Sequence, residues 1–335
     1  MAKRLLIFGG YGFVGGVIAK TAASTGWDVI IAGRNKKPGL MDTEFISLDI
    51  TDRQKVTDAF RKVKPDAVVN VAAVSNIDLA EREKKLAWSI NVDGARNIAE
   101  ACKISKTHLV FFSSDAVFSG QDSVYSEKDR PEPVNYYGYT KAEAEKAVFE
   151  AWPESVVLRI SLVLGFPVAG GNFILRSPEG MPKLTTETGS DAAVSTRAGK
   201  TTENGSFIAG LEKKLSESVE IQCPEDEYRT PVDVHTLAQA VLEMLTIDFS
   251  GLLHIGSTGS INRYELTKKA AELMGFDTKL VTKILPDTDD PNRAPRHKNG
   301  ILDVTKAVSL LQTKMLTVNE TIEKAIRLKS CIRKN

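Results

Sequence analysis

Tyr137 and Lys141 stand four positions apart in a segment, residues 136–150, whose pattern predicts a helix. Side chains at positions i and i+4 share a helix face, so the phenol and the ammonium group point the same way. A free tyrosine has a pKa of about 10, and a nearby cation favours its phenolate. Such a tyrosine can give or take a proton near neutral pH. Because the Tyr-x-x-x-Lys spacing is common on helix surfaces, it indicates catalysis only together with a second feature.

Ser114 is that second feature. It ends an apolar run, residues 108–114, that reads as a buried strand, and the next predicted helix carries the tyrosine. A serine hydroxyl there can hydrogen-bond the same substrate oxygen and stabilise the charge that develops on it. Ser114, Tyr137 and Lys141 together predict proton-coupled hydride chemistry, in which a cofactor supplies the hydride and the protein supplies position and the proton.

A glycine-rich stretch near the N-terminus predicts the binding site of that cofactor. It follows an apolar strand-like run, residues 5–8, and precedes a segment with helical spacing. The pattern Gly-x-Gly-x-x-Gly at a strand-to-helix turn lets backbone approach a pyrophosphate, and the helix N-terminus offers N–H groups and a positive dipole end. The predicted cofactor contacts in this turn are Gly9, Gly12, Phe13, Val14 and Gly15.

Arg34 bears on which dinucleotide is bound. It follows the second predicted strand, residues 27–32, at the place where an NAD site usually has an acidic residue for the ribose 2′-hydroxyl. A guanidinium suits a 2′-phosphate by its charge and its bidentate geometry. We therefore favour NADP(H) over NAD(H); the alternative is a solvated arginine in a turn.

Two polar residues farther along the chain, Asp49 and Asn91, each have two possible roles. Asp49, with Ile50, ends a third predicted strand over residues 44–50, and we predict both as cofactor contacts. The Asp49 carboxylate could accept a hydrogen bond from an adenine amino group, or it could cap the helix that follows. Asn91 lies in a long helix predicted over residues 78–103, where a buried amide is either a structural bridge or part of a relay.

The order of these elements predicts an α/β fold. Strand-length apolar runs alternate with helices up to residue 165, which is typical of a doubly wound parallel sheet of the Rossmann type. We place a dinucleotide-binding domain at residues 1–165, with a returning segment at 222–250. Residues 166–221 and 251–335 then form a smaller C-terminal α+β substrate domain, which includes a polar insert at 177–206.

Composition narrows the class of protein. The chain has 335 residues and a net charge of +1, so no strong field favours nucleic acid or an acidic membrane. Its apolar runs are too short for a membrane span or a signal peptide. Cys102, Cys223 and Cys331 are too far apart for a metal motif, and their odd number argues against a disulfide framework. We expect a reduced, cytoplasmic enzyme without a metal, and a homodimer is the assembly to test.

The order of glycine turn, Ser-Ser and Tyr-x-x-x-Lys resembles the extended short-chain dehydrogenase/reductases, most closely their dTDP-4-dehydrorhamnose reductase branch. The segments that carry the resemblance are similar to that branch's S-T-D-Y-V-F-x-G, N-A-A, D-x-A-E and Y-G-x-T-K motifs and to two later landmarks: residues 113–120, 70–73, 78–81, 137–141, 229–232 and 299–303. The likeness is strong up to residue 165 and thin beyond it.

The resemblance implies NADPH-dependent reduction of a 4-keto group on a nucleotide-linked 6-deoxyhexose. Ser114 would bind the carbonyl, Tyr137 would donate the proton, and Lys141 would tune Tyr137 and contact the ribose. Tyr137 is also assigned as a cofactor contact, together with Ala72 and Ala73. The further substrate contacts are Ser75, Asn172, Arg293 and Arg296. For Asn172 and the two arginines, which would meet the phosphates, the alternative is surface solvation.

Departures from the branch pattern leave other functions open. Ser114 replaces the branch's threonine and keeps the hydroxyl, whereas Ala116 replaces its tyrosine, next to Asp115. Dehydratases of the superfamily carry Asp-Glu at residues 115–116, so dehydration is disfavoured. An NAD-dependent sugar-nucleotide epimerase remains an alternative. So does a non-catalytic NADP-binding regulatory subunit resembling the beta subunit of methionine adenosyltransferase.

Overall fold

A computed structural model describes residues 2–36, 43–168, 205–284 and 293–328. Asn172 and residues 177–204 of the polar insert lie outside the described residues, so their predicted roles are untested by the structure. In the described ranges, no helix combines the length and the apolar content that crossing a bilayer requires.

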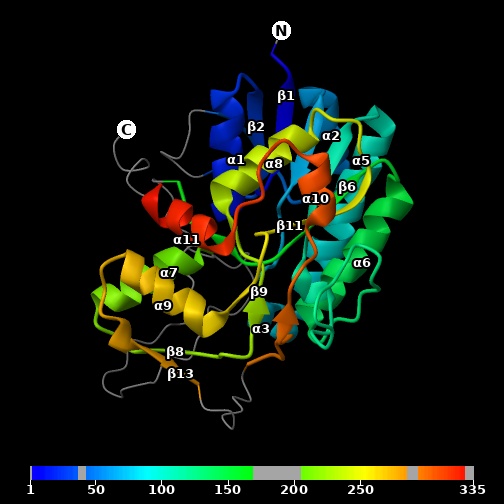
Figure 1. Cartoon of the computed structure of the whole chain (residues 1–335). Helices are drawn as coiled ribbons and strands as arrows, with labels where there is room; N and C mark the ends of the chain where they lie inside the picture. The colour runs from blue at the N-terminus through cyan, green and yellow to red at the C-terminus, as the bar shows by residue number, and fades with distance from the viewer. Residues whose placement is uncertain (1, 37–42, 169–204, 285–292, 329–335) are drawn as a thin grey trace, which may run out of the picture.

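A seven-stranded parallel sheet forms the centre of the fold (Figure 1), with the strand order β3-β2-β1-β4-β5-β6-β11. The strands are β1 (Arg4–Phe8), β2 (Asp28–Gly33), β3 (Glu44–Ser47), β4 (Ala67–Asn70), β5 (His108–Ser114), β6 (Val156–Ile160) and β11 (Gly251–Ile255). The order reverses between β1 and β4, and open α/β sheets bind ligands outside the strand ends at such a point. The predicted doubly wound Rossmann sheet is confirmed.

Helices cover both faces of this sheet (Figure 1). One face packs against α1 (Phe13–Ser24), α8 (Val234–Met244) and α10 (Thr305–Leu310), and the other against α2 (Arg53–Val63), α5 (Gly94–Ser105) and α6 (Tyr136–Ala151). In β1, Leu5 and Ile7 enter the first core while Leu6 and Phe8 enter the second, and all four are fully buried. Burial on both faces explains why the strands read as continuous apolar runs.

The helix predicted over residues 78–103 is broken into α3 (Ile77–Arg82), α4 (Lys84–Trp88), a π-helical turn (Ser89–Asp93) and α5. The break after α3 lies at Glu83, whose φ and ψ of −109° and 58° are not helical. The π-turn presents Asn91, which accepts from the backbone N–H of Val74 at 2.8 Å and donates to the Thr140 hydroxyl at 2.9 Å. Asn91 is therefore a structural bridge to α6.

A smaller part lies below the sheet in Figure 1. It contains α7 (Phe207–Ser216), α9 (Arg263–Leu273), α11 (Val318–Arg327), the pair β8 (Ile221–Cys223) with β13 (Val281–Lys283), and the sheet β12 (Ile261–Asn262), β9 (Tyr228–Arg229), β14 (Asn299–Gly300). Short 3-10 helices cover Asp115–Val117 and Thr278–Leu280.

Two strand predictions were wrong in detail. Residues 252–255, which we assigned to the smaller part, belong to β11 in the large sheet, because Leu253 and Ile255 are fully buried in the core beside α8. The last strand-length apolar run before residue 165, residues 155–165, divides into β6 and β7 (Val163–Leu164), and β7 pairs with β10 (Val232–Asp233) instead. The division into two domains at residue 165 remains a prediction.

Candidate active site

The glycine turn after β1 forms a backbone cradle. Gly9 has a φ of +83°, and a Cβ there would lie 2.9 Å from the backbone nitrogen of Ala72. A Cβ on Gly15 would lie 2.3 Å from the carbonyl oxygen of Gly9. No side chain caps α1, whose N-cap is Gly12, so the first N–H groups of the helix face the turn. Backbone amides at an uncapped helix N-terminus are suited to a pyrophosphate, so the cradle fits the predicted dinucleotide.

The neighbouring strand ends carry the residues predicted for the rest of the cofactor. Arg34 is exposed directly after β2, and the Ser47 hydroxyl donates to its carbonyl oxygen at 3.1 Å. Asp49 accepts from the backbone N–H of Thr51 at 3.0 Å, whereas Asp52 caps α2. The capping alternative for Asp49 is therefore wrong, and its contact with an adenine stays a prediction.

Ser114 and Tyr137 face each other at this edge of the sheet. Ser114 is the last residue of β5, Tyr137 lies in the first turn of α6, and the Ser114 side chain is near enough to the Tyr137 phenol to lower its pKa. Two contacts hold that first turn in place. Asn135 caps it by accepting from the N–H of Gly138 at 2.9 Å, and Glu81 accepts from the N–H of Tyr136 at 2.9 Å. The convergence that the sequence predicted for the two hydroxyls is present.

Tyr137 is a protonated phenol at neutral pH. Burial raises its pKa to about 12, the Asp115 carboxylate adds to the rise, and the contact with Ser114 opposes it. The expectation that Lys141 favours the phenolate is not met, because the Lys141 ammonium donates to the backbone carbonyl of Phe112. A phenol that keeps its proton is suited to donate one during a reduction.

Lys141 is almost completely buried, with 2% of its surface exposed. Its Nζ lies 4.3 Å from the centroid of the Phe111 ring. Burial lowers the pKa of Lys141 to about 7, although the Glu145 carboxylate one helical turn away opposes this change. Burial therefore places the loss of the Lys141 charge in the neutral pH range.

Asp115 extends the site toward the smaller part. Its Oδ1 accepts from the Ser114 hydroxyl at 3.1 Å, and its Oδ2 accepts from Ser161 at 2.7 Å. The same Oδ2 lies 3.4 Å from Nε2 of His297 and 3.5 Å from Nε of Arg229. Burial would raise the pKa of Asp115, but these neighbours outweigh it and hold the pKa at about 2. Asp115 belongs to one of the sequence motifs, but no local pattern predicted this network, because its members come from distant segments.

The predicted substrate arginines already have carboxylate partners. Arg293 donates to Glu227 at 2.8 Å, and Arg296 donates to Asp78 at 2.8 Å. Both arginines are partly buried, whereas Ser75 is exposed in the segment after β4. The substrate contacts of Ser75, Arg293 and Arg296 remain predictions.

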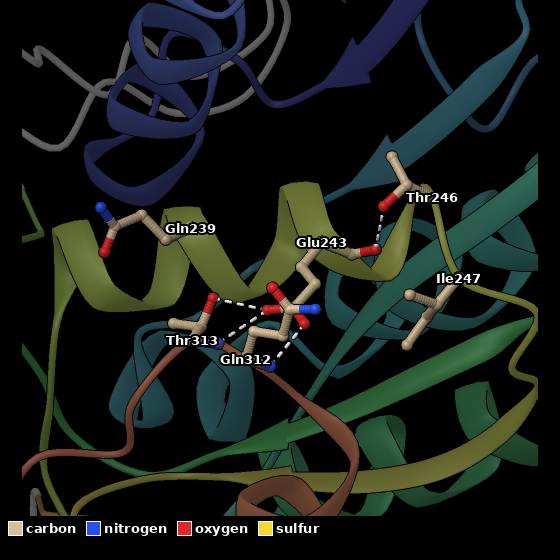
Figure 2. A pocket seen from close by; sticks show the side chains of 6 residues that line it. All are labelled: Gln239, Glu243, Thr246, Ile247, Gln312 and Thr313. Carbon is tan, nitrogen blue, oxygen red and sulfur yellow. Dashed lines mark hydrogen bonds between the residues drawn. The ribbon is translucent and has the colours of Figure 1, made fainter.

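A pocket away from the predicted site contains polar residues whose contacts are structural. It is lined by residues of α8, of the segment that follows α8 and of the segment after α10: Gln239, Glu243, Thr246, Ile247, Gln312 and Thr313 (Figure 2). The Glu243 carboxylate accepts from the N–H groups of Gln312 and Thr313 at 2.6 and 2.9 Å. These bonds attach the segment after α10 to α8, and no residue of the predicted site lines this pocket.

Comparison with known proteins shows the family of this chain. Residues 3–202 and 194–330 match the family model described as RmlD substrate binding domain. The chain belongs to this family. A dTDP-4-dehydrorhamnose reductase of Mycolicibacterium smegmatis is 28% identical, with 97% of this chain and 86% of that protein covered. The methionine adenosyltransferase 2 subunit beta of Rattus norvegicus is 26% identical, with 92% and 83% covered.

A solved structure gives the same picture for the fold. The dTDP-4-dehydrorhamnose reductase of Bacillus anthracis, solved in complex with NADP, superposes with a TM-score of 0.75 at 23% identity, and 98% of each chain is covered. The predicted place of this chain in the dTDP-4-dehydrorhamnose reductase branch of the extended short-chain dehydrogenase/reductases is confirmed. The RmlD family and its reductase members support a nicotinamide-dependent sugar-nucleotide reductase over the two alternatives.

Proposed function

We propose that this chain is an NADP(H)-dependent reductase of a 4-keto group on a nucleotide-linked deoxysugar. The observation that carries the proposal is the approach of the Ser114 side chain at the end of β5 to the Tyr137 phenol in the first turn of α6, with Lys141 one helical turn further along. The glycine cradle lies at the same edge of the sheet, where the ligands of this fold bind. The family's reductase members support the choice of reaction.

Each side chain of the site has a separate role in the proposed reduction. A reduced nicotinamide, when bound, supplies a hydride. Tyr137, which holds its proton at neutral pH, donates it to the carbonyl oxygen of the sugar. Ser114 hydrogen-bonds the same oxygen and stabilises its developing charge. Lys141 would add a buried positive charge beside the cofactor edge of the sheet and contact the ribose, as the family resemblance implies.

The proposal extends to the substrate contacts, the assembly and the compartment. We propose that Ser75 and Asn172 contact the substrate and that Arg293 and Arg296 meet its diphosphate. The two arginines would exchange their present carboxylate partners, Glu227 and Asp78, for phosphate oxygens. A homodimer and a cytoplasmic location are the assembly and the compartment we propose.

The purified protein, NADPH and a panel of 4-keto sugar nucleotides test the function. We expect NADPH to be consumed with at least one member and the product to carry a new hydroxyl at C4. Epimerase activity would appear instead as sugar interconversion with tightly held NAD. NADPH binding without turnover, together with stoichiometric capture of a synthetase, would favour the regulatory subunit.

Arg34→Ala is expected to weaken the binding of NADPH and to leave the binding of NADH nearly unchanged. A charge-assisted hydrogen bond contributes about 1.5–3 kcal/mol, so KM for NADPH should rise about 10- to 100-fold. Arg34 is exposed, so its removal should leave the fold intact. Arg61→Ala, an exposed arginine on α2, is the matched control. If KM for both cofactors stays unchanged in Arg34→Ala, the predicted contact with the 2′-phosphate is wrong.

The pH dependence of kcat/KM for NADPH should report the ionisation of Lys141. Lys141 carries its charge below its pKa of about 7 and loses it above. Since kcat/KM reports the free enzyme, its value for NADPH should fall on the alkaline side of that pH. Lys146→Gln, which removes an exposed lysine from the same helix, should keep this profile. A wild-type profile that is flat across the neutral range would contradict the expectation.

A further inference from the structure

Three consecutive residues of β5 are attached to one face of α6. The carbonyl of Phe112 accepts from Lys141, and the hydroxyl of Ser113 donates to Glu145 at 2.5 Å. The hydroxyl of Ser114 contacts Tyr137. The three partners on α6 follow one another at intervals of four residues, so they lie along a single helix face. The strand with the serine and the helix with the tyrosine thus meet at three positions along this face, two of them hydrogen bonds.

Glu145 makes the most extensive of these attachments. It is 4% exposed, and its two oxygens accept from Nε and Nη2 of Arg159 at 2.9 and 2.7 Å. Arg159 is 1% exposed and lies on β6 directly opposite Ser113 in the sheet register. A bidentate arginine–carboxylate pair fixes the relative orientation of the two side chains and adds to their interaction energy. Glu145 therefore ties α6 to two neighbouring strands at the level just behind the Ser114 hydroxyl.

The same carboxylate is the charged group that acts on Lys141. Glu145 opposes the effect of burial and favours the charged form of the lysine. Arg159, the cation on β6, is engaged by Glu145 itself, and Asp115 acts on Tyr137. Among the residues that the structure describes, the counter-charge of the buried lysine is therefore Glu145.

We propose that Glu145 is a positioning residue, which holds Tyr137 and Lys141 in register with Ser114 and supplies the counter-charge of Lys141. This inference rests on the proposed function. Glu145 acts through its neighbours and contacts neither the sugar nor the cofactor. Its loss should therefore change turnover and the pH profile and leave the affinity for the sugar as it was.

Glu145→Gln tests the proposal because it keeps the size of the side chain and removes its charge. We expect the alkaline limb of kcat/KM for NADPH to move about one pH unit to the acid side, which is a tenfold change in the proton equilibrium. We expect kcat to fall about tenfold and KM for the sugar to stay within about twofold. Glu143→Gln on the same helix, where Glu143 pairs with Lys146 at the surface, should behave as the wild type.

Two further measurements keep the outcomes distinct. If Glu145→Gln fails to fold, as loss of a buried pair allows, Ser113→Ala removes one hydrogen bond to Glu145 and should still lower kcat about threefold at unchanged KM for the sugar. NADPH binding against pH, measured without sugar, reports the Lys141 limb even if no substrate is turned over, so failure of the proposed function would be recognised separately. A folded Glu145→Gln, or in its place Ser113→Ala, with wild-type kcat and pH profile would overturn the proposal.

Discussion

Tyr137→Phe is expected to lower kcat for the keto sugar about 10²- to 10⁴-fold, the contribution of a positioned general acid. The substitution removes only the phenolic oxygen, which contacts Ser114 and carries the proton to be donated. KM for NADPH should change little, because the glycine cradle and Arg34 are untouched. The measurement is NADPH consumption at saturating sugar, with cofactor binding followed in parallel.

Tyr139→Phe is the matched control for this experiment. Tyr139 lies two residues further along α6 and is 42% exposed, so it points away from Ser114 and the sheet edge. Its replacement should leave kcat unchanged. Full activity of Tyr137→Phe would remove the proton donor from the account and leave only cofactor binding.

Gly138→Ala is expected to lower kcat/KM by about 10²-fold or more, because small misplacements of reacting groups have effects of this size. A Cβ on Gly138 would lie 1.9 Å from the carbonyl oxygen of Ala116, which is backbone and cannot rotate away. Either the first turn of α6 or the short helix after β5 must move. Either movement separates the Tyr137 hydroxyl from the Ser114 hydroxyl.

Gly259→Ala is the control for Gly138→Ala. The nearest atom to a Cβ at Gly259 is a methyl carbon of Val318 at 3.6 Å, which is ordinary contact. Circular dichroism and thermal unfolding would confirm that both variants fold. A folded Gly138→Ala with wild-type kcat/KM would show that the spacing of α6 and β5 does not control the reaction.

The outline of the fold and the site was predictable because the reactive residues follow strands that are easy to recognise. Gly9, Arg34, Ala72 and Ser114 each lie at or just after the carboxyl end of a buried apolar run, and parallel strands bring those ends together. Helix periodicity put Tyr137 and Lys141 on one face, and the preceding strand that ends in Ser114 made the pair informative. Local sequence therefore contained the information that placed the site.

The remaining features depend on tertiary contacts that no local pattern shows. The pKa of Tyr137 follows from its burial, which outweighs any effect of Lys141, and the lysine instead bonds to the backbone of β5. The pairing of β11 with β6 joins residues 95 positions apart, such as Gly251 and Val156, which periodicity cannot detect. Glu145 is one of several acidic residues on α6, and its position four residues after Lys141 was the usable signal.

The most direct measurement is a crystal structure of Tyr137→Phe with NADPH and a 4-keto sugar nucleotide. The account predicts a sugar carbonyl oxygen within hydrogen-bonding distance of the Ser114 hydroxyl and against the residue 137 ring, with the pyrophosphate on the amides that follow Gly12. A sugar bound elsewhere, or a Ser114 hydroxyl turned away from residue 137 with the cofactor in place, would contradict it.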